Sequence, residues 1–209
     1  MFLVLQIVAI YYTRARQRIQ ALTFINGGEQ YFLGIIMNCM KYLVASDIHG
    51  SVDSLKLLIH KFSELKYDRI ILLGDYLSYS KDDEKVVDML NFFRNEIIAV
   101  RGNCDYCLSD DTFGFELRDS FYMHLGTRNY LFVHGDNLLS NIEAMSRVEN
   151  AYIVYGHTHR VGSSITNTIN LVNIGSISLP RGLSKRCYGI LDENNLKIFS
   201  LEDELILAI

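Results

Sequence analysis

The chain has 209 residues, a length that suits one domain with a sizeable hydrophobic core. Hydrophobic residues make up 49% of the sequence and charged residues 21%, a composition that excludes an intrinsically disordered chain. The formal net charge of −4 provides no polybasic surface, so the composition argues against binding to a nucleic-acid duplex or to an anionic membrane.

The first 39 residues differ in character from the rest. An apolar run over residues 2–12 is followed by arginines within residues 14–18. The run is shorter than the about 20 apolar residues that span a bilayer, and a secretory signal places its basic residues before the apolar stretch. We therefore interpret residues 1–39 as an N-terminal extension, either a non-native upstream start or a poorly ordered segment, with a short membrane anchor as the alternative. Residues 40–209 are then the single domain.

From residue 41 onward, short apolar runs are each followed by a polar residue that can bind a metal ion. The runs lie at residues 42–46, 70–74, 97–102, 130–133 and 152–156, and they predict strands buried on both faces. The polar residues that follow them are Asp47, Asp75, Asn103, His134 and His157. Because ligands collect at the carboxyl ends of strands in open α/β sheets, we expect these positions to converge on one spot.

Helices are predicted between the first strands. Ser51 is expected to cap a helix in which apolar residues recur with helical spacing up to Leu65, and Val86 to Phe93 indicate a second helix. This alternation of strands and helices predicts an α/β fold. The second half of the chain changes character, with a hairpin predicted over residues 121–133 and several more short strands over residues 162–209. Either a mixed sheet, or two packed sheets with helices outside, fits this order.

The polar residues form a set of motifs rather than isolated positions. The motifs are Asp47-x-His49, Gly74-Asp75, Gly102-Asn103, His134-Gly135 and Gly156-His157-x-His159. A single such residue is more often a turn former or a hydrogen-bonded side chain, and we assign His60 and His124 to that ordinary class. The whole set predicts a dinuclear metal site, because two divalent ions about 3.5–4 Å apart need a bridging carboxylate and flanking imidazoles. Mixed imidazole and oxygen ligation suits Mn²⁺, our first expectation, or Ni²⁺, Fe²⁺ or Zn²⁺, better than Ca²⁺ or Mg²⁺.

In this order, the motifs resemble the calcineurin-like metallophosphoesterase superfamily, and most closely its small prokaryotic phosphodiesterase branch of the YfcE type. The resemblance covers residues 40–209 and continues into the segment Asn173–Arg181. It implies a four-layer αββα sandwich in which two mixed β-sheets are flanked by helices. It also implies a metal-dependent phosphodiesterase that hydrolyses small phosphodiesters by in-line attack of a metal-bridging hydroxide.

Carried over by position, the resemblance assigns a role to each motif residue. One ion would be held by Asp47, His49 and His159, the second by Asn103, His134 and His157, and Asp75 would bridge both. Asp75, Asn103 and His134 would also serve catalysis, and the Asn103 amide can donate a hydrogen bond to the phosphate.

Two neighbouring residues qualify this assignment. Cys104 stands where larger relatives carry a histidine that protonates the leaving oxygen. A neutral thiol is a poor general acid, and general acid catalysis is commonly worth about 10²–10⁴-fold, so we expect modest rates and a preference for good leaving groups. Asp105 is expected to support the catalytic residues from behind, with an ordinary turn aspartate as the alternative.

The substrate pocket departs from the family pattern, which leaves substrate identity open. Tyr76–Lys81 replaces a Gly-Pro-Arg-type loop, and Ile174-Gly-Ser176 replaces Pro-Gly-Ser. Ser176 and Arg181 would either contact substrate or lie at the surface. A phosphomonoesterase is the nearest alternative to the phosphodiesterase, and a non-catalytic protein-binding scaffold, as in the retromer subunit of this fold, is the other. The acidic core argues against a nuclease.

Cysteine usage and exposed apolar residues give the remaining expectations. A chain with a good core does not need disulfides, so we interpret the four cysteines as reduced thiols of a cytoplasmic protein. Cys104-x-x-Cys107 could also be half of a zinc site or a redox pair, although the chain has no second CxxC. Apolar residues in the hairpin half suggest a homo-oligomer, a dimer or a tetramer.

Overall fold

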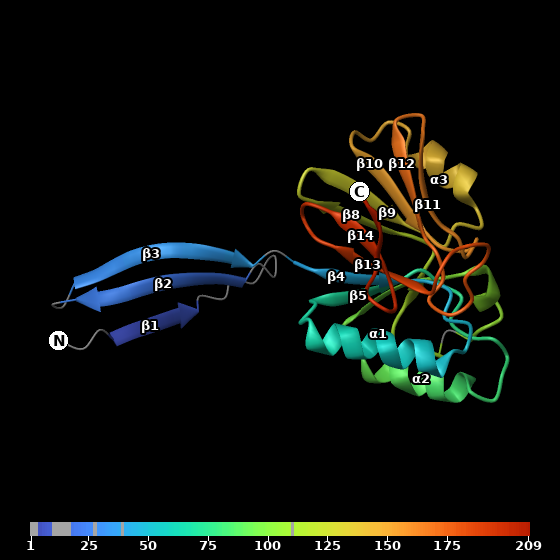
Figure 1. Cartoon of the computed structure of the whole chain (residues 1–209), viewed down its shortest axis with the longest axis horizontal. Coiled ribbons are helices and arrows are strands. Elements are labelled where there is room, and N and C mark those ends of the chain that lie inside the picture. Colours follow the sequence, from blue (N-terminus) through green and yellow to red (C-terminus); the bar gives the residue numbers. More distant parts are fainter. Residues whose placement is uncertain (1–3, 10–17, 27–28, 39, 110) are drawn as a thin grey trace. The chain divides into compact units, whose positions relative to one another are not determined.

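A computed structural model describes residues 4–9, 18–26, 29–38, 40–109 and 111–209, with side chains from residue 40 onward apart from residue 110. The chain divides into two units, Met1–Met40 and Lys41–Ile209 (Figure 1). In the first unit, the strands β1 (Val4–Ala9), β2 (Arg18–Asn26) and β3 (Glu29–Asn38) pair antiparallel in that order. No helix among the described residues is long and apolar enough to cross a membrane. That this unit is an extension outside the native domain stays a prediction.

The larger sheet of the second unit is mixed. Within the described residues it has seven strands in the order β15-β14-β13-β4-β5-β6-β7. Their bounds are β4 (Tyr42–Ala45), β5 (Arg69–Leu72), β6 (Ile97–Val100), β7 (Leu117–Arg118), β13 (Cys187–Leu191), β14 (Leu196–Ser200) and β15 (Leu205–Ala208). The strands β4 to β7 run parallel to one another, and β13, β14 and β15 add antiparallel on the other side of β4.

The second sheet of this unit is also mixed, with the described strands in the order β11-β12-β10-β9-β8. Their bounds are β8 (Phe121–Leu125), β9 (Arg128–Phe132), β10 (Ala151–Tyr155), β11 (Val161–Thr166) and β12 (Ile169–Ile174). Antiparallel pairing of β8 with β9 confirms the predicted hairpin, and β10 runs parallel to both β9 and β12.

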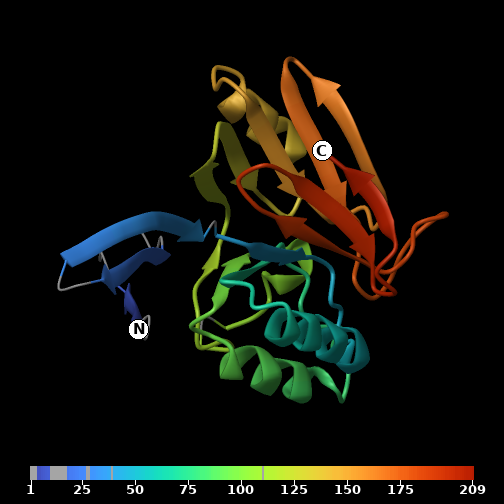
Figure 2. The same cartoon turned by 60° about the vertical axis from the view of Figure 1, so that its left-hand side comes forward.

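Helices cover the outer faces of both sheets. The helix α1 (Val52–Glu64) begins after Ser51, whose hydroxyl accepts a hydrogen bond from the Ser54 backbone N–H at 3.3 Å, as its predicted capping role requires. Together with α2 (Asp83–Phe92), it lies against the larger sheet in both views (Figures 1 and 2). The helix α3 (Leu138–Met145), which the sequence pattern did not predict, packs on the second sheet.

The core follows from the alternation of side chains along each strand. In β4, Leu43 and Ala45 pack in the cluster beneath α1 and α2, while Val44 between them is fully buried on the opposite face. In β9, Leu131 packs in the cluster beneath α3, while Tyr130 and Phe132 are fully buried on the other side. The predicted four-layer αββα sandwich is confirmed.

This layering decides where the polar motifs meet. The strands β4, β5 and β6 belong to the larger sheet, whereas β9 and β10 belong to the second sheet. The motifs therefore come from the carboxyl ends of parallel strands in two packed sheets, rather than from the edge of one open sheet. The packing of one sheet on the other brings the two groups of loops together.

Candidate metal centre

All seven candidate ligands lie at one end of the sandwich. Asp47 and His49 follow β4, Asp75 follows β5, Asn103 begins the short 3-10 helix η1 (Asn103–Asp105) after β6, His134 follows β9, and His157 and His159 follow β10. The other two histidines lie elsewhere, as predicted: His60 pairs with Glu64 on the surface of α1, and His124 contacts Asn129 within the hairpin.

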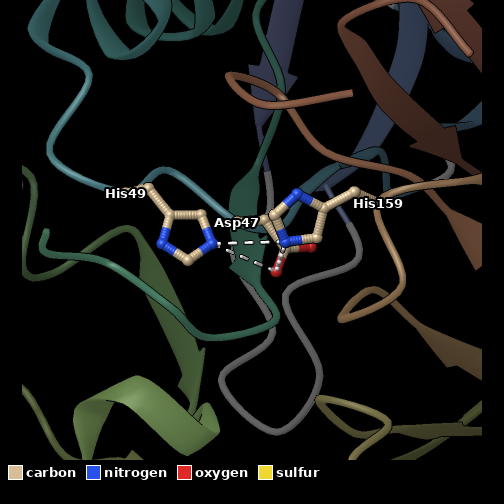
Figure 3. Close-up of side chains that lie close together, drawn as sticks. All are labelled: Asp47, His49 and His159. Atoms are coloured by element: carbon tan, nitrogen blue, oxygen red, sulfur yellow. Dashed lines mark hydrogen bonds and ion pairs between the residues drawn. The ribbon is translucent and has the colours of Figure 1, made fainter. Parts of the chain in front are cut away.

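One group of three side chains gathers its donor atoms around a common point (Figure 3). The Nε2 atoms of His49 and His159 are 3.3 Å apart. The Oδ1 atom of Asp47 lies 3.4 Å from His159 Nε2 and 3.8 Å from His49 Nε2. Donor atoms of a tetrahedral ion with bonds of 2.0–2.2 Å are about 3.4 Å apart, so these three atoms are spaced as ligands of one ion.

A second group lies beside the first, and Asp75 joins the two. His134 Nε2 is 3.0 Å from the Oδ1 atom of Asn103 and 3.1 Å from His157 Nδ1. The Oδ2 atom of Asp75 lies 3.5 Å from His134 Nε2 in the second group and 3.5 Å from His49 Nε2 in the first. The Asp75 carboxylate is therefore equally close to both groups of donor atoms.

Further features show that the residues fit divalent metal ions. Asp47 is buried, and its Oδ1 atom accepts no hydrogen bond within the described residues. A buried carboxylate oxygen that accepts no hydrogen bond is costly, and a cation relieves that cost. In addition, the Nδ1 atoms of His134 and His159 lie 2.7 and 2.6 Å from the carbonyl oxygens of Leu73 and Leu179. Nδ1–H donation to these carbonyls leaves each Nε2 lone pair free for a metal.

The surroundings shift the pKa values of His49 and His159 in opposite directions. Burial lowers the pKa of His49, against the opposing effect of the Asp75 and Asp47 carboxylates. The pKa of His159 is raised, chiefly by its contact with the Asp47 carboxylate. Burial, followed by the Asp75 carboxylate, raises the pKa of the Cys104 thiol to about 12, so this thiol stays protonated at neutral pH.

The ligand loops adopt an unusual backbone. Asp47, His49, Asp75, His157 and His159 all have positive φ angles, of 58°, 44°, 56°, 61° and 61°. The left-handed conformation costs a non-glycine residue about 1–2 kcal/mol, and such strain persists only where the surroundings enforce it. At Asp47 the enforcement is visible, because the hydroxyls of Ser176 and Ser178 both donate hydrogen bonds to its carbonyl oxygen, at 2.9 and 2.8 Å.

Asp105 acts on the loops rather than on a substrate. Its buried carboxylate accepts hydrogen bonds from the backbone N–H groups of Asp75, Gly102 and Tyr76, at 2.8, 2.7 and 3.1 Å. Burial raises the pKa of this carboxyl, and the backbone donors oppose the rise. The structure therefore makes Asp105 a positioning residue that joins the loop after β5 to the loop after β6, rather than a turn aspartate.

Sequence reasoning missed other positioning residues. The side-chain amide of Asn173 donates to the Gly156 carbonyl at 2.7 Å and to the Thr158 hydroxyl at 2.9 Å, which ties β12 to the histidine loop. Ser176, considered as a substrate contact, is instead fully buried behind Asp47. Since Asn and Ser are common in turns, nothing in their sequence setting marked these two roles.

The site opens into a cavity of about 390 Å³. The cavity is lined by His49, Asp75, Asn103, Cys104, His157, Thr158, His159, Arg160 and Arg181. Of these residues, Cys104 donates a hydrogen bond from its backbone N–H to Asp75 Oδ1 at 2.9 Å. The described cysteines Cys104, Cys107 and Cys187 are free thiols.

The fold and this arrangement of imidazoles and carboxylates define a metal-dependent hydrolase, and comparison with known proteins gives its family. The profile of the calcineurin-like phosphoesterase superfamily domain matches residues 40–196. Phosphodiesterase YfcE of Escherichia coli (strain K12) is 31% identical over 179 residues, which cover 81% of this chain and 96% of that protein. The chain therefore belongs to the calcineurin-like phosphoesterase superfamily, and the resemblance stated from the motifs is confirmed.

Solved structures agree with this assignment. The structure of YfcE, a phosphoesterase from E. coli, superposes with a TM-score of 0.70 at 28% identity, over 81% of this chain and 98% of that chain. Vacuolar Protein Sorting 29 from Cryptosporidium parvum superposes with a TM-score of 0.59 at 17% identity, over 82% of this chain and 98% of that chain. The second likeness shows the fold alone.

Proposed function

We propose that this protein is a dinuclear-metal phosphodiesterase that hydrolyses small phosphodiesters. The observation that carries the proposal is the position of Asp75 Oδ2, at 3.5 Å from an imidazole nitrogen of each ligand group. The similarity to phosphodiesterase YfcE supports the same reaction class. A scaffold of this fold would not need seven donor side chains at one point, nor a buried carboxylate oxygen without a hydrogen-bond partner.

The proposed ligand sets follow the two groups. Asp47, His49 and His159 hold one ion, Asn103, His134 and His157 hold the other, and Asp75 is shared. When bound, such ions lower the pKa of a water nucleophile and neutralise charge on the phosphoryl oxygens. Imidazole and carboxylate donors suit Mn²⁺, which we expect first, or Ni²⁺, Fe²⁺ or Zn²⁺.

The chain's own residues orient the substrate and leave the departing oxygen without an acid. Asn103 and Cys104 both line the cavity, where the Nδ2 atom of Asn103 lies 3.5 Å from the Cys104 sulfur and can donate a hydrogen bond to a phosphoryl oxygen. The Cys104 thiol, with its pKa raised to about 12, is a much weaker acid than an imidazolium. The leaving oxygen therefore takes its proton from water, which favours leaving groups of low pKa.

The cavity has room for a phosphodiester. The cavity of about 390 Å³ extends from the ligand groups to Arg160 and Arg181. This space is larger than one phosphoryl group requires, and it leaves room for a second substituent on phosphorus. A phosphomonoester with a large substituent would fit the same space, so the phosphomonoesterase is the second candidate, and the ratio of the two activities separates them.

Hydrolysis of a generic aryl phosphodiester and of its matching monoester tests the proposal. The full chain is assayed after chelator treatment, with and without added Mn²⁺, Ni²⁺, Fe²⁺ or Zn²⁺. We expect metal-dependent diester cleavage that exceeds monoester cleavage, and its loss in His134→Ala and in Asp75→Asn. His60→Ala is the matched control, because His60 is exposed on α1 and contacts only Glu64 among the interactions described. A folded protein that cleaves neither ester with any of these metals would contradict the proposal and favour the scaffold.

We also propose which residues carry the activity, how the chain self-associates and where the protein is located. We assign the activity to residues 40–209, which the profile match over residues 40–196 supports. Self-association into a dimer or tetramer is expected to use exposed apolar residues such as Tyr122 on β8, which ends its sheet. The cytoplasmic location stays a prediction.

A further inference from the structure

A second cavity adjoins the metal cavity. Its volume is about 580 Å³, and two residues, Arg160 and Arg181, line both cavities. Arg160 directly follows the ligand His159, and the Arg181 backbone N–H donates to the His159 carbonyl at 2.9 Å. A Cβ atom added at Gly182, next to Arg181, would lie 3.7 Å from Arg160 Nε. The two arginines therefore both lie at the boundary between the cavities, close to the metal centre.

No described carboxylate neutralises the two arginines at this boundary. Within the described residues, neither guanidinium forms an ion pair, and the third cation of the second cavity, Lys185, is paired with Glu204. Residues 40–209 carry 17 basic and 23 acidic side chains, so unpaired arginines beside the site are not the product of a generally basic surface. Both are exposed and free to meet an anion.

Part of the wall of the second cavity is apolar. Val161, Leu183 and Ile206 line it, and the side chain of Leu183 is fully exposed. An exposed leucine beside unpaired arginines suits a ligand with an apolar portion next to its charge. A bare inorganic anion would use the arginines and leave this wall uncovered.

We propose that Arg160 and Arg181 bind a second phosphoryl group, carried by one of the two alcohol substituents of the diester, while the apolar wall contacts the rest of that substituent. This inference rests on the proposed phosphodiesterase function. The substrate class is a phosphodiester with a further phosphate monoester on one arm, as in a short phosphorylated nucleotide. The planar guanidinium fork matches phosphate in two-point hydrogen bonding, which a lysine cannot reproduce.

An alternative use of the same arginines makes a different prediction. If they held the scissile phosphate itself, their loss would weaken every diester equally. If they hold a second phosphate, their loss removes the preference for the phosphorylated diester and leaves the ratio of the two substrates near 1. The ratio therefore distinguishes the two roles, whatever happens to the absolute rate.

Binding to the chelator-treated full chain tests the inference without turnover. Isothermal titration compares a thymidine dinucleotide with and without a 5′-phosphate, for the native sequence, Arg160→Gln and Arg181→Gln. We expect the phosphorylated dinucleotide to bind about tenfold more tightly to the native sequence, because charge-assisted hydrogen bonds are the strong ones, and each variant to lower that ratio at least threefold. Arg147→Gln is the matched control, since Arg147 is exposed and lines neither cavity. Equal affinities, or no binding of the phosphorylated form at millimolar concentration, would overturn the inference.

Hydrolysis by the Mn²⁺-loaded protein shows whether a negative result refutes this inference or the proposed function. The ratio of kcat/KM for the same two dinucleotides should follow the binding ratio. Diester hydrolysis with a kcat/KM ratio near 1 would refute the second phosphate site and leave the phosphodiesterase intact. A binding preference abolished by Arg160→Gln, without hydrolysis of either dinucleotide, would support the site and refute the reaction.

Discussion

Replacement of Asp105 by alanine should destabilise the metal-free protein strongly, although Asp105 contacts neither substrate nor metal in this account. Its carboxylate accepts from the backbone N–H groups of Asp75, Gly102 and Tyr76 at 2.8, 2.7 and 3.1 Å. Asp105 is fully buried. The substitution Asp105→Ala therefore leaves three backbone donors without their acceptor.

The expected magnitude follows from the cost of a buried donor without a partner, about 1–3 kcal/mol each. Water can enter the space that the carboxylate leaves and satisfy part of this requirement, so we expect a loss of about 3–5 kcal/mol rather than the full sum. Asp105→Asn should lose less, about 2–3 kcal/mol. Its amide oxygen still accepts, but its NH₂ group faces a backbone N–H that also needs an acceptor.

Urea denaturation of the chelator-treated protein measures both losses, with Asp88→Ala as the control. Asp88 is exposed on α2, and an exposed substitution of this kind changes stability by about 0.5 kcal/mol or less. Metal affinity should fall together with stability, since the same bonds position Asp75. A loss below about 1 kcal/mol for Asp105→Ala, with an unchanged urea m-value, would refute the reasoning.

Three further perturbations have defined outcomes. A Cβ atom at residue 156 would lie 2.0 Å from a serine hydroxyl oxygen and 2.6 Å from Asp47 Oδ2. Gly156→Ala should therefore lower the free energy of unfolding, measured by urea denaturation, by about 3 kcal/mol or more. In the control Gly162→Ala, the added Cβ meets nothing within 4 Å, and the loss should be about 1 kcal/mol or less. Ser178→Ala removes one of the hydrogen bonds that hold the Asp47 carbonyl, so it should lower stability by about 1 kcal/mol and weaken Mn²⁺ binding in a calorimetric titration. Burial raises the pKa of the Cys187 thiol from 9.0 to about 11, so this thiol ionises at lower pH in the unfolded chain than in the folded one. The free energy of unfolding, intact below pH 9, should therefore fall by about 2–3 kcal/mol as the pH rises to 11. Cys187→Ala should show a smaller alkaline loss, and an equal loss would contradict this cause.

Much of the fold follows from local patterns. The apolar runs predicted β4, β5, β6, β9 and β10 to within a residue or two, and Ser51 caps α1 as expected. The helix α3 was missed, because its eight residues include Asn, Ser and Glu and give only two helical turns of periodic pattern. The arrangement into two sheets depends on contacts far apart in the sequence; the order of elements left it as one of two alternatives, and the family resemblance favoured it.

The candidate site, like the fold, was predictable from the sequence only in part. Asp47, His49, Asp75, Asn103, His134, His157 and His159 were named from their motifs, and the structure places them together. The left-handed backbone of five of them could not be predicted, because φ > 0 is disfavoured for these residues and is imposed by tertiary hydrogen bonds. For the same reason the roles of Asn173, Ser176 and Ser178 appeared only when distant segments met.

Metal stoichiometry tests the central claim most directly. The chelator-treated full chain is dialysed to equilibrium against Mn²⁺, and bound metal is measured by elemental analysis for the native sequence, Asp75→Asn and the control His124→Ala. Two groups of donors joined by Asp75 predict two ions per chain for the native sequence and for His124→Ala, and at most one for Asp75→Asn. One ion or none in the native sequence at saturating Mn²⁺, or two ions retained by Asp75→Asn with undiminished affinity, would contradict the account of a dinuclear centre bridged by Asp75.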